Sequence, residues 1–209
     1  MAVLLDSADL NDVSAAAALG FVTGVTTNPT LLRQVTDDPL KHAAELLAAT
    51  DFPEVYYQPT GAHGELFDEA LQAWKLAPER IVLKVPATPA GAVLAQRLVR
   101  EGVAVSLTAA QSPNAMIIAE AVGAASVIPY VDRAWRDPRI GNDLVRQLSG
   151  LRRKNTRIVA ASVKNTGQFT QAFADGADAV TAPLGVLTQV LVHPAALEAE
   201  EAFSGEYGR

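Results

Sequence analysis

The chain has 209 residues, of which 49% are hydrophobic and 19% are charged, and its formal net charge is −6. These values are typical of one globular domain with a well-buried core, and they exclude an intrinsically disordered chain. The acidic balance argues against a nucleic-acid partner. The absence of cysteine excludes disulfides, thiolate nucleophiles and thiolate-bound metals.

The first residues lack the features of a targeting segment. Residues 1–6 contain no basic side chain, and their apolar run is too short for a signal peptide. No apolar stretch of the sequence is long enough to span a bilayer. We therefore expect a cytoplasmic protein without a membrane partner.

Short apolar runs alternate with helical segments along the chain. The apolar runs predict strands over residues 3–5, 22–25, 54–58, 81–85, 103–107, 126–131, 157–161 and 179–181. The segments between them predict a first helix that is capped by Ser7 or Asp9 and runs through Val13 to Leu19. Further helices are predicted over residues 39–49, 65–76, 90–100, 113–122, 143–153 and 167–174. Two further helices are expected after the last strand, over residues 185–192 and 195–203.

This alternation sets the expected fold. Strands joined by helical crossovers form parallel sheets, and eight such units predict a closed (β/α)8 TIM barrel of the α/β class. We expect residues 1–209 to form a single domain with an extra C-terminal helix. The alternative is an open doubly wound sheet. No glycine-rich phosphate-binding fingerprint follows the first strand, which disfavours that alternative.

Lys84 is the most informative single residue. It lies inside the apolar run Ile81-Val82-Leu83-Lys84-Val85-Pro86, where burial would remove its ammonium from water. Burial lowers the pKa of a lysine from about 10.4 toward neutrality, and a neutral amine can attack a carbonyl group to form a Schiff base. The plain alternative is a lysine that extends its amine to solvent from the end of the strand.

Other polar side chains follow the remaining predicted strands. In a TIM barrel the C-terminal ends of the strands surround one active site, so these side chains are expected to converge. With Lys84, the candidate set is Asp6, Thr26, Asn28, Gln58, Thr108, Tyr130, Arg133, Ser162 and Lys164. Taken singly, each has a plain structural reading, because turn and cap residues are common: Asp6 and Thr108 can cap helices, and Asn28 can be a turn residue before Pro29.

Together, the candidates form a chemically coherent site. Lys84 would be the nucleophile, Asp6 would shuttle protons, and Asn28 would orient the amine or hold a substrate hydroxyl. The groups suited to hold a water for proton transfer are Gln58, Thr108 and Tyr130. The groups suited to bind a phosphate are Arg133, Ser162 and Lys164. The histidines lie away from the strand ends, so we expect neither a histidine catalyst nor a metal site; they are His42, His63 and His193.

Five sequence motifs carry a family resemblance. They are Leu5-Asp6, Gly24-Val25-Thr26-Thr27-Asn28-Pro29-Thr30, Val82-Leu83-Lys84-Val85-Pro86, Pro129-Tyr130-Val131-Asp132-Arg133 and Ala160-Ala161-Ser162-Val163-Lys164. In this order they resemble the transaldolase family, in the short-chain branch that includes fructose-6-phosphate aldolase. The resemblance implies a (β/α)8 barrel, class I (Schiff-base) aldol chemistry, and neither a metal nor another cofactor.

The resemblance also implies roles for individual residues. Lys84 would form the Schiff base, Asp6 would assist proton transfer, and Asn28, with Thr26 nearby, would hold the dihydroxyacetone part of the substrate. Arg133 and Ser162 would bind the phosphate. Lys164 stands where the family often has a second basic residue.

Two positions distinguish the branches of the family. Gln58 stands where transaldolases proper resemble one another in a glutamate, and Tyr130 stands where they have a phenylalanine. The Gln58 amide cannot take up a proton as a glutamate can. Gln58 and Tyr130 both resemble the residues of the aldolase branch at these positions. The local departures are Pro59, which stiffens the loop after Gln58, and the segment Trp135-Arg136-Asp137.

We therefore expect a class I aldolase that cleaves or forms the C3–C4 bond of a ketose phosphate such as fructose 6-phosphate, with an aldehyde as second substrate. The alternatives are a transaldolase, which transfers the dihydroxyacetone unit between sugar phosphates, and a sugar-phosphate-binding barrel without turnover. The resemblance further implies that the helix over residues 195–203 is an arm that packs on a neighbouring subunit. A homo-oligomer, pentameric or decameric, is expected.

Overall fold

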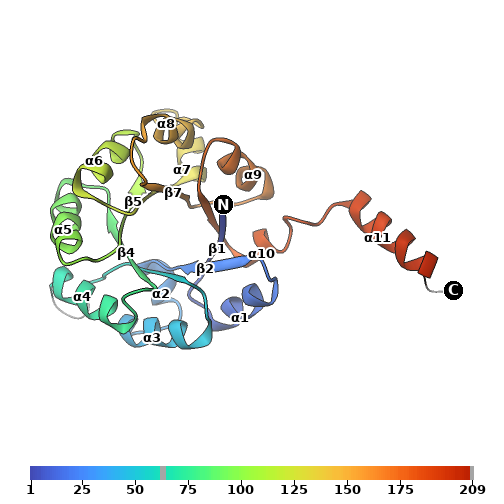
Figure 1. Ribbon diagram of the computed structural model, residues 1–209, viewed down its shortest axis with the longest axis horizontal. Helices are drawn as coiled ribbons and strands as arrows, with labels where there is room; N and C mark the ends of the chain where they lie inside the picture. Colours follow the sequence, from blue (N-terminus) through green and yellow to red (C-terminus); the bar gives the residue numbers. More distant parts are fainter. Residues whose placement is uncertain (62–64, 208–209) are drawn as a thin grey trace.

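The computed structural model describes residues 1–61 and 65–207 and shows a closed barrel of eight parallel strands (Figure 1). Each strand pairs with the next along the chain, and β8 returns to β1 with Leu5 opposite Ala182. The strands are β1 (Ala2–Asp6), β2 (Val22–Thr26), β3 (Glu54–Tyr57), β4 (Ile81–Pro86), β5 (Val105–Ala110), β6 (Ser126–Pro129), β7 (Arg157–Ala160) and β8 (Ala179–Ala182). The predicted TIM barrel is confirmed.

A ring of helices surrounds the strands in Figure 1. The helices are α1 (Leu10–Ala18), α2 (Pro29–Arg33), α3 (Pro39–Ala49), α4 (Leu66–Leu76), α5 (Pro89–Arg100), α6 (Asn114–Val122), α7 (Val131–Arg136), α8 (Leu144–Leu151), α9 (Thr166–Ala174), α10 (Leu184–Leu187) and α11 (Pro194–Tyr207). The inner faces of the helices in the ring and the outer faces of the strands form the larger hydrophobic core, to which the described part of α11 contributes no residue.

Several predicted boundaries are wrong. The short helices α2 and α7 follow β2 and β6 directly, where the sequence was interpreted as a turn and as a continuing strand. Strand β5 begins at Val105 and reaches Ala110, further along the chain than predicted. The helix predicted over residues 185–192 is reduced to α10, because the chain then leaves the barrel and Leu191 is 77% exposed. A segment without a packing partner lacks the contacts that stabilise most helices in proteins.

The inside of the barrel has its own smaller core, closed at the N-terminal ends of the strands. Ile128 and Val159 are buried there. Nearer the N-terminal ends of the strands, Arg157 at the start of β7 forms an ion pair with Glu54 at the start of β3. The Tyr56 hydroxyl donates a 3.1 Å hydrogen bond to Glu54. Glu54, Tyr56 and Arg157 line a hollow of about 280 Å³ at the N-terminal end, and the buried side chains of the smaller core separate it from the other end of the barrel. The polar side chains of the C-terminal ends therefore surround the open end.

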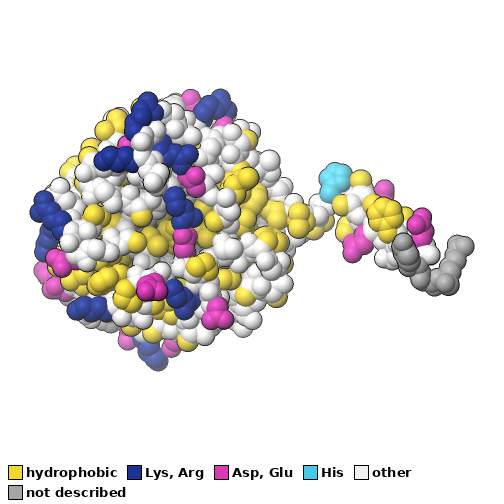
Figure 2. All heavy atoms as spheres, viewed as in Figure 1, with side chains coloured by type: hydrophobic (Ala, Val, Ile, Leu, Met, Phe, Trp, Pro, Cys, Tyr) yellow, Lys and Arg dark blue, Asp and Glu magenta, His cyan; other side chains and the backbone are white. Residues whose placement is uncertain are grey.

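Helix α11 extends away from the barrel at the C-terminal end of the described chain (Figure 1). It carries exposed apolar side chains, including Leu197 and Phe203, which are 52% and 64% exposed. Figure 2 shows hydrophobic and acidic side chains side by side on this helix. Within the described residues, neither α11 nor any other helix has the length and apolar character needed to cross a membrane.

Candidate active site

A cavity of about 450 Å³ opens at the C-terminal ends of the strands. The predicted site residues that line it come from β1, from β4 and from the segments that follow β2, β3, β6 and β7. They are Asp6, Asn28, Gln58, Lys84, Tyr130, Arg133, Ser162 and Lys164. Thr26 and Thr108, the other two predicted residues, are buried and are not among the lining residues.

Lys84 lies in β4 with only 3% of its surface exposed. Its Nζ atom donates a 2.6 Å hydrogen bond to the backbone oxygen of Thr27, in the short connection between β2 and α2. Burial lowers the pKa of Lys84 from 10.5 to about 8, and the nearby Asp6 carboxylate opposes this shift by favouring the charged amine. At pH 7 roughly a tenth of the molecules therefore carry a neutral amine in the cavity. The predicted burial is confirmed.

Asp6 is held at the end of β1 by a chain of buried hydroxyl groups. The Thr26 hydroxyl lies 3.0 Å from Asp6 Oδ1 and 2.7 Å from the Thr181 hydroxyl. Because the carboxylate is an acceptor, Thr26 donates to Asp6 and accepts the hydrogen bond of Thr181. Thr181 lies in β8 and was missed in the sequence. Thr181 is on the same face of β8 as Ala179, which faces the inside of the barrel. The sequence of β8 does not indicate that Thr26 is its hydrogen-bond partner.

Asn28 has a structural role in addition to its place in the cavity. Its Oδ1 atom accepts hydrogen bonds from the backbone nitrogens of Thr30 and Leu31, both at 3.0 Å, and so caps the N-terminus of α2. This capping fixes the side chain and uses its oxygen. The amide NH₂ group is left as the part that can donate to a substrate hydroxyl.

Two of the three predicted water-holding groups, Gln58 and Tyr130, line the cavity. The Thr108 hydroxyl, on β5, is buried and has no hydrogen-bond partner within the described chain. Such a group is uncommon in folded proteins, and it is available to a molecule bound beside it. The cavity that contains Lys84 therefore offers the Gln58 amide and the Tyr130 hydroxyl, and the Thr108 hydroxyl lies on the adjacent strand β5.

The predicted phosphate-binding groups come from two adjacent loops. The Arg133 guanidinium lies over the Tyr130 ring, 4.7 Å from its centroid. The side chain of Gln168 connects the two loops: its Nε2 donates to Asp132 at 3.1 Å, and its Oε1 accepts from the backbone nitrogen of Lys164 at 2.8 Å. The buried Gln168, which the sequence did not reveal, thus connects the two segments that carry the cationic side chains.

Two residues of the lining have left-handed backbone conformations. Ala109 has φ 56° and Ser162 has φ 60°, and neither is glycine. Such conformations cost free energy and concentrate at functional sites. Ala109 was not predicted, because an alanine gives no sequence signal for positive φ. Gln111, two residues later, has a buried and unpartnered Oε1, but it lines a groove beside α6 and not this cavity.

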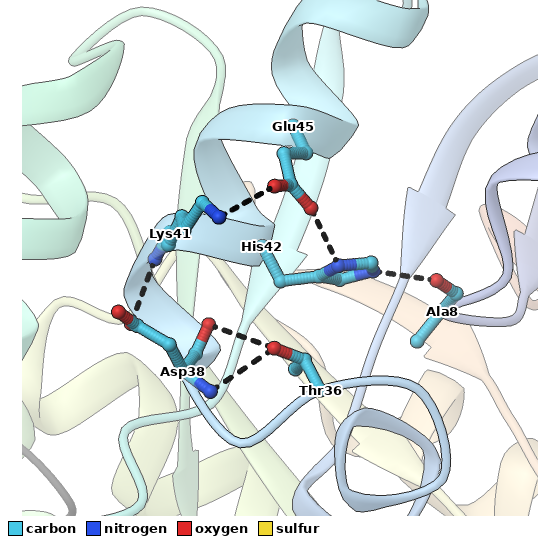
Figure 3. A network of polar contacts seen from close by, with 6 residues as sticks. All are labelled: Ala8, Thr36, Asp38, Lys41, His42 and Glu45. Carbon is cyan, nitrogen blue, oxygen red and sulfur yellow. Dashed lines mark hydrogen bonds and ion pairs between the residues drawn. The ribbon is translucent and has the colours of Figure 1, made fainter.

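His42 is structural. Its Nε2 lies 2.7 Å from the backbone oxygen of Ala8, and its Nδ1 lies 3.1 Å from Glu45, which also pairs with Lys41 (Figure 3). His42 thereby connects α3 to the loop that follows β1.

The other two histidines lie elsewhere. His193 lies before α11, and His63 lies outside the described residues. Within residues 1–61 and 65–207, no group of three or more His, Asp and Glu side chains is arranged to hold a metal ion.

Comparison with known proteins identifies the family. The model of the family described as Transaldolase/Fructose-6-phosphate aldolase matches residues 3–207. The chain belongs to this family. Its relatives include probable transaldolases from Symbiobacterium thermophilum, 32% identical over 93% of this chain and 91% of that protein, and from Maridesulfovibrio salexigens, 31% identical over 99% and 98%. Family membership indicates an enzyme of the transaldolase or aldolase type.

A solved structure supports the fold independently. Inosine 5′-monophosphate dehydrogenase from Legionella pneumophila superposes with a TM-score of 0.65 over 89% of this chain, which spans 58% of that protein. The two sequences are 12% identical, so the likeness shows the barrel fold alone.

The burial of Lys84 predicts a specific pH dependence of stability. Its pKa is about 8 in the folded chain and 10.5 when unperturbed, so between these values the unfolded chain binds more protons and stability rises with pH. The gain is about 3 kcal/mol. Lys84→Met removes it, so the stability of this variant relative to wild type should fall by that amount between pH 7 and 10.5. Urea unfolding of both proteins measures the difference, and parallel pH curves would contradict the assignment.

Proposed function

We propose that this protein is a Schiff-base aldolase acting on a ketose phosphate such as fructose 6-phosphate. The observation that carries the proposal is the buried amine of Lys84, with a pKa lowered to about 8, in the wall of a cavity lined by polar side chains. A neutral amine is the form that attacks a carbonyl group, and burial supplies it near neutral pH.

The donor half of the substrate would bind around Lys84. Its Nζ attacks the C2 carbonyl, and loss of water gives an iminium ion. The C3–C4 bond then breaks as the C4 hydroxyl loses its proton to Asp6, and the bonding electrons enter the iminium to form an enamine. The aldehyde leaves, and the dihydroxyacetone unit stays bound to Lys84. The Asp6 carboxylate near Lys84 also disfavours a phosphate on this half of the substrate, so the phosphate belongs at the other end.

The phosphate would bind at the mouth, between Arg133, Ser162 and Lys164. These three residues line the same cavity as Lys84. The Arg133 guanidinium packs over the Tyr130 ring. Gln168 accepts a hydrogen bond from the backbone nitrogen of Lys164, and these contacts support the phosphate site. Two cations and a hydroxyl match the charge and hydrogen-bonding capacity of a phosphate.

The fate of the enamine separates two candidate activities. In a free aldolase, a water held by Gln58, Thr108 and Tyr130 supplies the proton for C3 and then hydrolyses the iminium, which releases dihydroxyacetone. The amide at position 58 and the phenol at position 130 favour this outcome. The second candidate is transfer of the unit to another aldehyde, which the description of the relatives as probable transaldolases favours. Assay of dihydroxyacetone release without an added aldehyde distinguishes the two.

Borohydride trapping tests the central step. Wild-type protein incubated with fructose 6-phosphate and sodium borohydride should gain the mass of the reduced dihydroxyacetone adduct on Lys84, located by peptide mass spectrometry. Lys84→Met should show no adduct. An adduct retained by Lys84→Met, or located on another lysine, would refute the assignment. Binding of fructose 6-phosphate without trapping would instead indicate a sugar-phosphate-binding barrel.

Removal of Arg133 tests the phosphate site. Charged hydrogen bonds are worth about 1.5–3 kcal/mol, so Arg133→Ala should raise the KM for fructose 6-phosphate about tenfold to a hundredfold. Trapping with dihydroxyacetone, which has no phosphate, should be unchanged. Arg139→Ala is the matched control, because Arg139 is exposed, pairs with Asp137 and is not among the cavity-lining residues. Equal effects of the two substitutions would contradict the proposed phosphate site.

We also propose that the protein forms a homo-oligomer, pentameric or decameric, through α11. The support is the extension of this helix from the barrel with Leu197 and Phe203 exposed. Isolated helices of this length are marginal in water, so a partner surface would stabilise it. Sedimentation velocity should show an assembly for wild type and a smaller species for the double variant L197S/F203S. A monomeric wild type would refute the proposal.

A further inference from the structure

Glu69 is a buried carboxylate with no part in the chemistry described above. It lies in α4, and its side chain has no exposed surface. Burial of a charged group is costly unless hydrogen bonds compensate for the lost water. The hydrogen-bond partners of Glu69 therefore show which part of the chain its carboxylate holds in place.

The described donors to Glu69 come from the chain on both sides of Gln58. The Tyr57 hydroxyl and the backbone nitrogen of Thr60 each donate to Oε1 at 2.7 Å, and the Thr60 hydroxyl does so at 3.1 Å. The backbone nitrogen of Gly61 donates to Oε2 at 2.8 Å. Gly61 has φ 82°, so consecutive backbone N–H groups point to one carboxylate, as in an anion-binding nest.

These contacts fix the backbone of residues 58–61, which follow β3. Burial, together with the Glu69 carboxylate, raises the pKa of Tyr57, so its phenol stays protonated and donates. An apolar residue at position 69 would leave the donors of Tyr57, Thr60 and Gly61 without this acceptor, and a buried donor such as the Tyr57 hydroxyl is costly to leave unpaired. What the carboxylate adds is a defined backbone path, and Gln58 is the residue of this path that faces the cavity.

We propose that Glu69 is a positioning residue that holds the Gln58 amide in the active site. The inference rests on the proposed function, in which Gln58 helps to hold the water that protonates and hydrolyses the enamine. Displacement of Gln58 slows release of dihydroxyacetone more than its transfer to an aldehyde, because only release depends on that water. The ratio of release to transfer is therefore the diagnostic quantity. It is independent of how much of the protein is folded.

The variant Glu69→Gln keeps the shape of the side chain but places an NH₂ group opposite one of the N–H donors. With fructose 6-phosphate as donor and D-glyceraldehyde as acceptor, Glu69→Gln and Gln58→Ala should each lower the release-to-transfer ratio about tenfold. The double variant should show no further decrease, because both changes act on the same group. Asp175→Asn is the matched control. Asp175 is a buried carboxylate held by Arg146 before β8, and its replacement should leave the ratio unchanged.

Amide hydrogen exchange gives a second measurement, which does not depend on activity. Exchange at Thr60 and Gly61 should accelerate at least tenfold in Glu69→Gln and stay unchanged in Asp175→Asn. If Glu69→Gln does not fold, Tyr57→Phe removes one donor only and should accelerate exchange at the same amides to a smaller extent. Additive effects of Glu69→Gln and Gln58→Ala on the ratio, or unchanged exchange, would overturn the inference while leaving trapping at Lys84 intact. A wild type that neither traps nor cleaves substrate would refute the proposed function, and the exchange rates would still decide whether Glu69 holds the loop.

Discussion

The structure depends on one constraint, which is the confinement of the Lys84 amine within the barrel. Its Nζ is removed from water, and the backbone oxygen of Thr27 is the protein acceptor that it reaches. Desolvation disfavours the ammonium while the Asp6 carboxylate favours it, and desolvation is the larger effect. The strands that flank β4, together with the helices outside them, exclude the solvent that would otherwise restore the ordinary pKa. The barrel is thus the means by which a lysine carries a neutral amine in part of the molecules near neutral pH.

The neighbours of Lys84 are held in place by contacts of their own. Asp6 is oriented by the hydroxyls of Thr26 and Thr181, and Asn28 is fixed because it caps α2. Gln168 connects the two loops that carry the cationic side chains. A preorganised site of this kind loses little free energy to rearrangement when a substrate binds. Most of the supporting contacts lie one layer behind the cavity, on elements of the barrel itself.

The sequence revealed the parts of the molecule that depend on local pattern. Alternation of strands and helices gave the barrel, and a lysine among apolar residues stood out because its environment is unfavourable to charge. The helices α2 and α7 were missed because only one or two residues separate each of them from the preceding strand, where turn and strand signals overlap. Thr181 was missed for a different reason. Its partner Thr26 is 155 residues away, and only closure of the barrel brings the two hydroxyls together. The backbone conformation of Ala109 likewise depends on its surroundings and not on its side chain.

The buried core at the N-terminal end of the barrel determines how substrates and products enter and leave the cavity. The ion pair between Glu54 and Arg157, with Tyr56 above it, occupies the end opposite the mouth. Under the proposed chemistry, every molecule then enters and leaves through the same opening, so the first aldehyde must depart before a second one can approach the enamine. The leaving aldehyde and the acceptor aldehyde never occupy the interior at the same time, while the dihydroxyacetone unit stays bound to Lys84. One set of cationic side chains at the rim can therefore serve both in turn.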